Sequence, residues 1–355
     1  MKNKKIALFI CGAKRNYPRN IQILRFLKEY FKVIEITSNK SFYLLRLSEV
    51  LGRFLFSVLF QRNYDLIFIG FLGQPLMPVV KLLVRGPIIF DALVSIYDTL
   101  CLDRKSFNPN SIVGKITFWL DKKSFQWAQK IVTDSKTHTD YFSKLFDIER
   151  EKFQILYNIA DERLFYPRET KKTDKFTIFF DGTFLPLHGI DYIVRAARLL
   201  GEEKDILFRI VGKGKEKNKI LKLAEDLNIK NIEFIDWIPH DELPSEIAKA
   251  DLCLGGHFSN IDKAKRVISG KAFQYLAMKK PIIVGDNPAV RELFIHREDV
   301  YMCKMADEKA LAGAILELRD NKVLREKIAE RGFETFKQKC NFKQARENLL
   351  RIIED

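Results

Sequence analysis

The sequence predicts an α/β protein of two domains, each a parallel β-sheet with helices on both faces. The chain has 355 residues, which is enough for two domains of roughly 150 to 200 residues each. Short runs rich in β-branched and aromatic residues alternate with helical patterns, which is the element order of a parallel sheet. The polar, charged stretch 166–175 has no hydrophobic period and separates the two series.

In the first series the alternation is less regular than in the second. The strands expected from β-rich runs are 5–11, 31–37, 65–71, 87–93 and 130–135. The helices expected from a helical period are near 20–30, 42–60, 75–84 and 113–128. An irregular stretch, 98–112, interrupts them. This series predicts an N-terminal Rossmann-like domain over 1–165.

The second series alternates with little ambiguity. Its expected strands are 177–182, 206–212, 232–235, 251–256, 281–286 and 300–303. Its expected helices are 190–200, 217–227, 241–249, 267–279, 307–319 and 322–338, with a helical turn leading into Glu292. It predicts a C-terminal Rossmann-like domain over 166–339, and ligands of such sheets bind outside the carboxyl ends of the strands.

The charge points to an anionic partner. The chain has 61 Lys and Arg against 46 Asp and Glu, a net charge of +15. Residues 1–165 hold 26 basic and 15 acidic side chains, so most of the excess lies in the first half. A zinc-finger spacing, an RNA-recognition signature and a long basic run are all missing, and we therefore expect no nucleic-acid partner. A membrane surface or a phosphorylated ligand fits the charge.

The cysteines and the N-terminal residues predict a protein of the cytoplasm. The five cysteines are scattered without a C-x-x-C pair, so we expect buried thiols and neither disulfides nor a zinc site. The basic start is followed by a short apolar run that continues as a strand, which is unlike a signal peptide. A protein that lies peripherally on the inner face of the membrane is compatible with this.

The stretch 42–60 comes nearest to a membrane segment but is interrupted by charges. Arg46, Glu49 and Arg53 are spaced at three and four, so a helix gathers them on one side and the leucines and phenylalanines on the other. Such a helix can lie in a bilayer interface. It can also be a buried domain helix with one edge in water.

The glycine motifs exclude two common classes of nucleotide site. The first expected strand ends in CGAKRN, which lacks the G-x-G-x-x-G spacing of a dinucleotide site. The segment VGKGKEK, 211–217, lacks the spacing and the Ser or Thr of a P-loop. Neither a hydride-transfer enzyme nor a P-loop ATPase is supported.

Five segments of the second half give a more specific signal by their order. They are DGTFLPLHGIDYIVRAARLL, FRIVGKGKE, IEFIDWIPHDELPSEIAKADLCLGG, SGKAFQYLAMKKPIIVGD and AVRELF. In this order they resemble the nucleotide-binding half of family 4 glycosyltransferases, which are retaining enzymes of the two-domain GT-B fold. The likeness covers about 177–300. The first half resembles the family only in its layout, including PIIFDALVSIYDTL and WAQKIVTDS.

The resemblance implies a diphosphate site that uses cationic side chains and helix starts and no metal. Gly182 and Thr183 stand where the family has a glycine that an arginine often follows. His188 and Gly189 stand in the place of the family's Lys-Gly. Histidine still donates to phosphate, and a nearby phosphate favours its charged form. A histidine that only caps its helix is the alternative.

The resemblance also assigns a second cation and two substituted positions. Lys271, in the first turn of an expected helix, faces the diphosphate or is a solvated lysine. Gln274 stands where the family's glutamate accepts hydrogen bonds from the ribose. Arg266 stands where another glutamate approaches the transferred sugar, and it pairs with an acidic sugar or is a surface charge. The paired glutamates are absent, which leaves the donor sugar and the activity open.

Two loops would complete the nucleotide site. Gly212, Lys213 and Gly214 form a loop that the nucleotide can approach closely. Trp237 and Ile238 match the loop whose backbone reads the base, although a tryptophan there can also serve packing.

In the first half, polar side chains after the expected strands are acceptor candidates. Asp98, with Asp91 and Ser95, would line the site, where a carboxylate can orient the acceptor hydroxyl, while Asp98 can also cap a helix. Arg15 and Arg19 lie in the loop after the first strand, where the family binds an acceptor or donor phosphate. Both can also be solvated.

The sequence therefore predicts a retaining glycosyltransferase of the hexosyltransferase type. Its donor is a nucleotide diphosphate sugar, with no further cofactor. Its acceptor is a lipid-linked or cell-surface glycan, and an anionic membrane surface is an expected partner. The resemblance implies that a C-terminal helix, 340–355, completes the first domain. The alternatives are a sugar-nucleotide epimerase of the same fold and an inactive donor-binding partner subunit.

Overall fold

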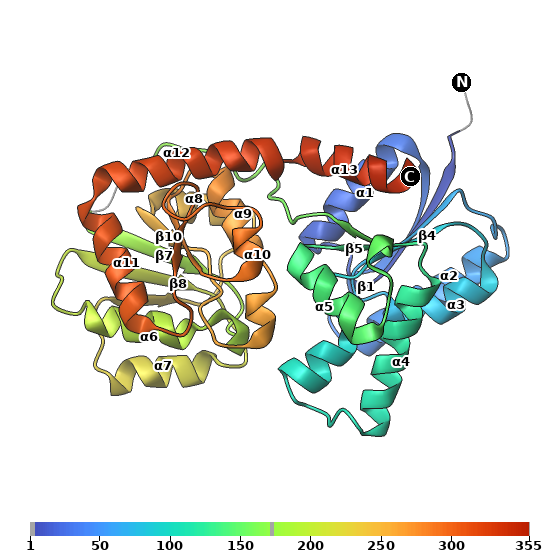
Figure 1. Cartoon of the computed structure of the whole chain (residues 1–355), viewed down its shortest axis with the longest axis horizontal. Helices are drawn as coiled ribbons and strands as arrows, with labels where there is room; N and C mark the ends of the chain where they lie inside the picture. The colour runs from blue at the N-terminus through green and yellow to red at the C-terminus, as the bar shows by residue number, and fades with distance from the viewer. Residues whose placement is uncertain (1–3, 171–173, 355) are drawn as a thin grey trace. The chain divides into compact units, whose positions relative to one another are not determined.

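The structure, a computed structural model, describes residues 4–170 and 174–354 (Figure 1). It divides into two compact units. The first runs up to Tyr157 and includes the residues from Arg346 on; the second runs from Asn158 to Ala345. Residues 171–173 of the expected linker and residue 355 of the expected last helix lie outside the described residues.

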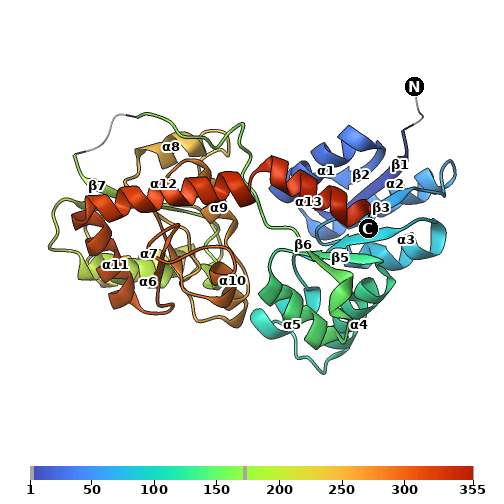
Figure 2. The same cartoon turned by 45° about the horizontal axis from the view of Figure 1, so that its top comes forward.

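The first unit contains a parallel sheet that has six strands in the described part of the chain (Figure 2). The strand order is β2-β1-β3-β4-β5-β6. The strands are β1 (Ile6–Lys14), β2 (Lys32–Ser38), β3 (Leu66–Ile69), β4 (Ile88–Asp91), β5 (Lys130–Thr133) and β6 (Phe153–Ile155). The chain reverses its direction across the sheet between β1 and β3, which makes this pair the topological switch point.

Five α-helices of the described residues lie wholly in the first unit, and a sixth, α13, enters it at Arg346. They are α1 (Pro18–Tyr30), α2 (Tyr43–Val58), α3 (Met77–Leu83), α4 (Ile112–Trp127), α5 (Lys136–Phe146) and α13 (Phe342–Glu354). Because crossovers between parallel strands are right-handed, α2, α3 and α4 share one face of the sheet and α1 lies on the other. Ile10, Phe54, Phe90 and Phe125 are fully buried in the core between sheet and helices.

The second unit contains a parallel sheet of order β12-β11-β10-β7-β8-β9, again six-stranded in the residues described. Its strands are β7 (Phe176–Asp181), β8 (Ile206–Val211), β9 (Ile232–Ile235), β10 (Leu252–Leu254), β11 (Ile282–Gly285) and β12 (Tyr301–Cys303). Its switch point lies between β7 and β10. The predicted class, two parallel sheets with helices on their faces, is confirmed.

The helices of the second unit follow the predicted order. They are α6 (Ile190–Leu199), α7 (Lys217–Asp226), α8 (Leu243–Lys249), α9 (Gly270–Ala277), α10 (Pro288–Arg291), α11 (Glu308–Asp320) and α12 (Lys322–Lys339). Ile193, Phe208, Leu254 and Ile315 are fully buried in the core of this unit. All five cysteines are buried and free, as predicted.

Helix α2 does not bury the side that its sequence pattern suggests for a buried domain helix. Arg46 is buried with Val50, Phe54 and Val58, four residues spaced at i+4 along the side that packs on β1 and β2. The Arg46 guanidinium donates to the carbonyl oxygens of Gly12 and Lys40 at 2.9 and 2.6 Å, which satisfies it inside the unit. Most of the leucines and phenylalanines face solvent instead. The expectation of three charged residues along the wet edge of this helix is therefore wrong for Arg46, whereas Glu49 is half-buried and Arg53 is exposed.

Candidate functional site

The candidate donor site lies at the carboxyl ends of β7, β8 and β10, at the switch point of the second unit. Gly182 follows β7, Gly212 follows β8, and His257 comes three residues after the end of β10. Helix α6 begins after Gly189 and α9 begins at Gly270. The topology thus brings together loops and helix starts from separate parts of the sequence, as it does in other doubly wound sheets.

Two glycines let these loops approach one another. Gly189 has a φ of 67°, and a Cβ built on it would lie 2.5 Å from the Ser259 nitrogen. Gly212 has a φ of 146°, and a Cβ there would lie 1.9 Å from the Gly182 carbonyl oxygen. Any side chain would therefore push the loops apart, because neither backbone atom can move freely. Both positions need glycine in order to keep the site compact.

Lys271 is the buried cation of the site. It is in the first turn of α9, is 8% exposed, and its Nζ donates to Ser269 Oγ at 3.2 Å. The Nζ also lies 4.8 Å from the centre of the Phe180 ring. Burial lowers the pKa of Lys271 to about 8, although the Asp181 carboxylate opposes this shift. A buried ammonium with little direct neutralisation favours an anionic ligand.

Asp181 and Tyr275 form a reciprocal pair beside this lysine. The Tyr275 hydroxyl donates to Asp181 Oδ1 at 2.5 Å, and the Asp181 backbone N–H donates to the Tyr275 hydroxyl at 3.1 Å. Burial raises the pKa of Asp181, while Lys271 and the tyrosine hydroxyl oppose the rise. The pair ties the end of β7 to α9, and so fixes Lys271 against the strand ends.

Two stacked histidines lie next to Lys271. The rings of His188 and His257 have centroids 5.2 Å apart and planes 20° apart. Burial and the charge of Lys271 lower the pKa of His188 well below its usual value, and that of His257 to about 3. The Nδ1 atom of each ring is buried and has no hydrogen-bond partner among the described residues. Both imidazoles are thus neutral at pH 7.

The starts of α6 and α9 add backbone donors. Neither helix start is capped by a side chain in the described part of the chain. The first N–H groups of a helix lack internal partners, and the helix dipole makes them attractive to anions. His188 precedes α6 and Lys271 lies in the first turn of α9, so each helix start has a basic side chain beside it.

The other predicted nucleotide residues lie on the rim of the strand ends. Lys213 Nζ lies 4.7 Å from the centre of the Trp237 ring, and Trp237 is 61% exposed, so packing does not account for it. Thr183 is exposed, whereas Ile238 and Arg266 are half-buried. Gln274 is half-buried and lies one helical turn after Lys271 on α9.

In the first unit, the acceptor candidates are mostly engaged inside the fold. Asp98 is 1% exposed and accepts a hydrogen bond of 2.7 Å from the Tyr141 hydroxyl. Arg19 lies in α1 and not in the preceding loop, is 4% exposed, and forms a 2.9 Å ion pair with the buried Asp91. The expectation of a phosphate-binding Arg19 in a loop is wrong, because this ion pair and the Leu156 carbonyl hold its guanidinium.

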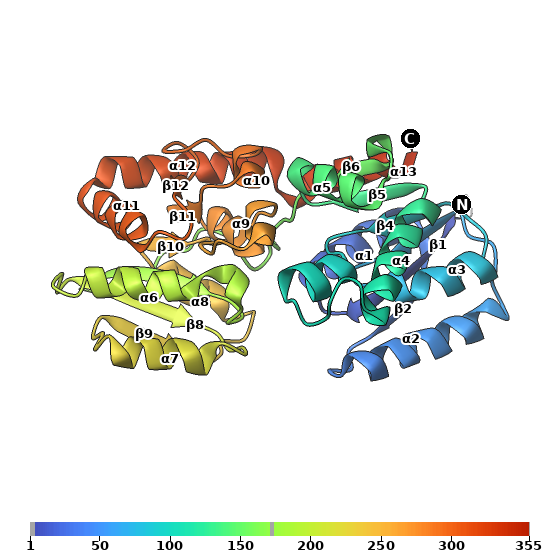
Figure 3. The same cartoon turned by 60° about the horizontal axis from the view of Figure 1, so that its bottom comes forward.

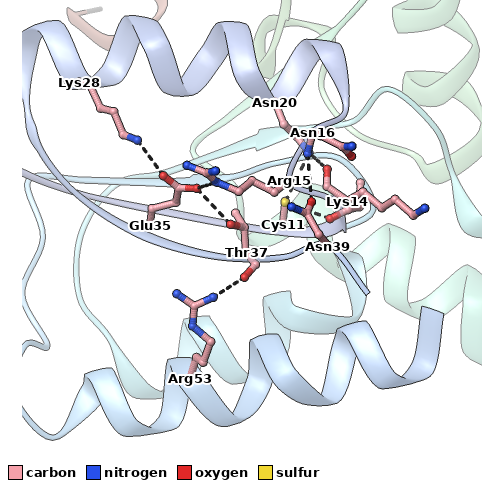
Figure 4. A network of polar contacts seen from close by, with 11 residues as sticks. Cys11, Lys14, Arg15, Asn16, Asn20, Lys28, Glu35, Thr37, Asn39 and Arg53 are labelled. Carbon is pink, nitrogen blue, oxygen red and sulfur yellow. Dashed lines mark hydrogen bonds and ion pairs between the residues drawn. The ribbon is translucent and has the colours of Figure 1, made fainter. Parts of the chain in front are cut away.

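Arg15 takes part in an open polar pocket of the first unit. Figure 4 shows Glu35 between Arg15 and Lys28, at 2.5 and 2.8 Å. Burial would raise the pKa of Glu35, but these two cations lower it to about 2. The pocket lies at the ends of β1 and β2, and its lining residues are Arg15, Glu35, Thr37, Ser38, Asn39, Glu49 and Arg53. About half of the Arg15 side chain stays exposed to it.

The family model that describes glycosyl transferases group 1 matches residues 162–335, which include the whole candidate donor site. The second unit therefore carries the domain of the group 1 glycosyltransferases. The predicted resemblance of the second half to this family is confirmed. Arg266 and Gln274, where the resemblance expects glutamates, remain departures from the family pattern.

Two curated relatives have glycosyltransferase names. The glycosyltransferase MJ1178 of Methanocaldococcus jannaschii is 24% identical over 69% of this chain and 64% of its own length. The O-antigen chain mannosyltransferase RfbU of Salmonella typhimurium is 20% identical over 64% of this chain and 61% of its own. The aligned part of this chain thus spans less than two thirds of the length of either relative.

A solved structure shows the same fold over the full length. The crystal structure of HepE from Anabaena in complex with UDP has a TM-score of 0.74 and 13% identity, covering 98% of this chain and 99% of that protein. The GT-B architecture is confirmed by this likeness.

Three residues of the site were missed by sequence reasoning. Asp181 and Tyr275 are 94 residues apart, and no sequence pattern links them. His257 follows two glycines after a short strand, and this glycine-rich end of β10 was the available signal.

In the described residues, no group of three or more His, Cys, Asp or Glu side chains is placed to hold a metal ion. None of the described helices has the length and apolar character for crossing a membrane.

Proposed function

We propose that the second unit binds the diphosphate of a nucleotide diphosphate sugar at the switch point between β7 and β10. The buried ammonium of Lys271 is the observation that carries this proposal. Burying a charge costs desolvation free energy. A bound anion offsets this cost by interacting directly with the buried ammonium. A diphosphate supplies that anion, and the uncapped starts of α6 and α9 supply further donors.

His188 contributes a hydrogen bond or a charge to the same diphosphate. Its Nδ1 is shielded from solvent and unpartnered among the described residues, so a ligand oxygen or a water gains a ready partner there. A phosphate beside the ring opposes the repulsion from Lys271 and raises the pKa of His188 toward the charged form. His257, stacked behind it, fixes the orientation of the ring.

The rim residues suit the rest of the donor. Trp237 with Lys213 offers an exposed aromatic face near the end of β9, where a base can stack, and Ile238 offers its backbone. Gln274 can accept from a ribose hydroxyl through its amide oxygen. Arg266 supplies a cation for an acidic donor sugar. Gly182, Thr183 and Gly214 let the diphosphate approach the backbone.

The reaction proposed for this site is the transfer of a sugar with retention at the anomeric carbon. The bond from the anomeric carbon to the diphosphate oxygen breaks, and a bond to the acceptor oxygen forms on the same face. The nucleoside diphosphate leaves with the electron pair of the broken bond, and its leaving oxygen takes up the proton that the acceptor hydroxyl loses. Lys271, His188 and the two helix starts stabilise the negative charge on the leaving diphosphate.

The acceptor in this proposal is a lipid-linked or cell-surface glycan that binds to the first unit. The pocket at the ends of β1 and β2 supports this, since Arg15, Asn39 and Arg53 offer hydrogen-bond donors. The name of RfbU, an O-antigen chain mannosyltransferase, is in keeping with such an acceptor. The excess of basic residues in 1–165 adds an anionic membrane surface as a partner.

A thermal-shift panel tests the donor assignment. UDP, GDP, dTDP and ADP, each alone and as a sugar conjugate, are added with and without magnesium. A ligand at a hundredfold excess over its dissociation constant stabilises the folded state by about 2.7 kcal/mol, which shifts the melting temperature visibly. We expect a selective response to one base. UDP is the first candidate, because HepE was solved with UDP. A response to none would contradict the assignment.

Product analysis with the donor alone distinguishes an epimerase from a transferase. An epimerase converts the donor without an acceptor, whereas a transferase leaves it intact apart from slow hydrolysis. The names of the relatives favour the transferase. An inactive partner subunit would bind the nucleotide and yield no glycoside with any acceptor.

A further inference from the structure

The outward side of α2 is an exposed apolar surface. Its large apolar side chains on this side, with those of the turn that follows, are 46% to 76% exposed. They are Leu44, Leu45, Leu55, Phe56, Leu59 and Phe60. Figure 3 shows α2 as the outermost helix of its unit, with the sheet on its other side. They form one group at each end of the outward side, with the exposed Ser48 and Gly52 between the groups. Two such groups on one side of a helix mark a contact with something apolar.

The orientation of α2 shows that this exposure is built into the fold. The helix buries Arg46 and leaves most of its leucines and phenylalanines outside. Arg46 is held by the carbonyl oxygens of Gly12 and Lys40, and Arg53 donates to the Thr37 carbonyl oxygen at 2.5 Å. These hydrogen bonds hold Arg46 inside the unit and tie the exposed Arg53 to β2, and so they fix the helix with its apolar side outward.

Helix α4, on the same face of the sheet, repeats the pattern. Ile112, Ile116 and Trp119 are 78%, 53% and 47% exposed and are spaced at four and three along the helix. The basic side chains of α4 are at least partly exposed, whereas its carboxylate, Asp121, is fully buried and accepts from Ser95 Oγ. Near α2, Lys40, Arg53 and Arg62 are exposed.

We infer that the outward sides of α2 and α4 lie in the interface of an anionic lipid bilayer. Apolar side chains that enter the acyl boundary, with cations at the level of the lipid phosphates, are the arrangement of an interfacial helix. Charge decides against a second copy of the chain as the occupant. A two-fold interface would set the cations of one copy against those of the other, which is unfavourable, whereas lipid phosphates neutralise them.

The polar pocket at the ends of β1 and β2 lies next to the apolar side of α2. This proximity specifies the acceptor further, and it rests on the proposed function. Glu49 and Arg53, on the inward edge of α2, line the polar pocket, and Leu55 and Phe56 follow on the outward side. A glycan attached to a lipid can thus reach the pocket while its lipid stays in the bilayer that α2 contacts. The inference names the acceptor class as a membrane-bound glycolipid.

The test is co-sedimentation with vesicles of phosphatidylcholine alone and mixed with phosphatidylglycerol. The variant is Leu55→Ser with Phe56→Ser. The matched control is Leu199→Ser with Val323→Ser, which removes two apolar side chains, 50% and 79% exposed, from the second unit. We expect the intact protein to prefer the anionic vesicles, and the α2 variant to bind them about tenfold or more weakly than the control.

Two further readouts keep the result unambiguous. Stabilisation by UDP, measured on each protein without vesicles, reports the donor site of the other unit and should be equal in all three. Vesicle binding without any UDP response would remove the donor assignment and leave this inference standing. Equal binding by the α2 variant and the control would overturn the inference. The inference would also be overturned if the intact protein formed a dimer that does not bind vesicles, and if the α2 variant were a monomer.

Discussion

The imidazole of His188 lies stacked on that of His257, with 5.2 Å between ring centroids and 20° between planes. Lys271 lies beside both rings, and its charge adds to burial in lowering their pKa values. Lys271, His188 and His257 can each carry a positive charge and lie together in one buried cluster. Of these three, only Lys271 is charged at pH 7. A bound diphosphate has the opposite effect, because its negative charge raises the pKa of Lys271 and of both histidines.

The buried histidines make the protein sensitive to acid. In the unfolded chain His257 takes up a proton near pH 6.5, but the folded protein resists until about pH 3. Stability is therefore lost as the pH falls below 6.5. We expect the urea midpoint to drop between about pH 6.5 and 5, and His257→Gln to flatten this slope. The control His240→Gln changes an exposed histidine of the same unit and should keep the original slope.

Nucleotide affinity should weaken in alkali because of Lys271. Its pKa in the empty site is about 8, so above that pH binding must first restore its proton. The dissociation constant of UDP should then rise by up to about tenfold per pH unit above pH 8. Lys271→Arg keeps a charge at all these pH values, and we expect a flat profile from it by calorimetry. A flat profile in the unaltered protein would mean that Lys271 does not meet the phosphate.

Gly189 should tolerate no side chain. Gly189→Ala places a methyl group 2.5 Å from the Ser259 nitrogen on a backbone with a φ of 67°. We expect a loss of about 1–3 kcal/mol in the free energy of unfolding, measured with urea. In the control Gly313→Ala, the methyl group meets no atom of the described chain within 4 Å and lies inside α11. This control should gain up to about 1 kcal/mol. Equal effects would show that the tight approach at Gly189 is not real.

The ion pair of Arg19 and Asp91 should be a major support of the first unit. Asp91→Asn removes the direct ion-pair partner of the buried guanidinium and leaves Asp134 as its acidic neighbour, and we expect a loss of about 3 kcal/mol in unfolding free energy. Asp140→Asn breaks the pair of Arg150 and Asp140, in which both side chains are more than half exposed. It should change stability by less than about 0.5 kcal/mol. A small effect of Asp91→Asn would return Arg19 to the list of ligand-binding candidates.

The order of strands and helices could be predicted from the sequence, because most elements have a clear period. The exceptions have physical reasons. Helix α5 is rich in Thr, Ser and aromatic residues, which are weak helix formers, and β6 has three residues. The side of α2 that is buried was not predictable, because its periodicity is the same whichever side faces the sheet. Hydrogen bonds from Arg46 to two loops decide it.

The candidate site was predictable where a residue follows a strand or starts a helix. The family resemblance pointed to His188, Gly189 and Lys271, and the structure places all three at helix starts beside the strand ends. The contacts that shape the site join distant segments: Tyr275 reaches Asp181 and His257 stacks on His188. Burial also changed the interpretation of Asp98 and Arg19, whose sequence context resembles that of exposed polar residues.

The most direct test of the account is calorimetric titration of UDP into the unaltered protein, Lys271→Ala and Lys219→Ala. Lys219 is an exposed lysine of α7, with a side chain 77% exposed, and serves as the matched control. The account predicts that Lys271→Ala weakens binding by about tenfold or more, as for loss of a charge-assisted hydrogen bond, and that Lys219→Ala binds like the unaltered protein. Equal affinities in all three proteins would contradict a diphosphate site at Lys271.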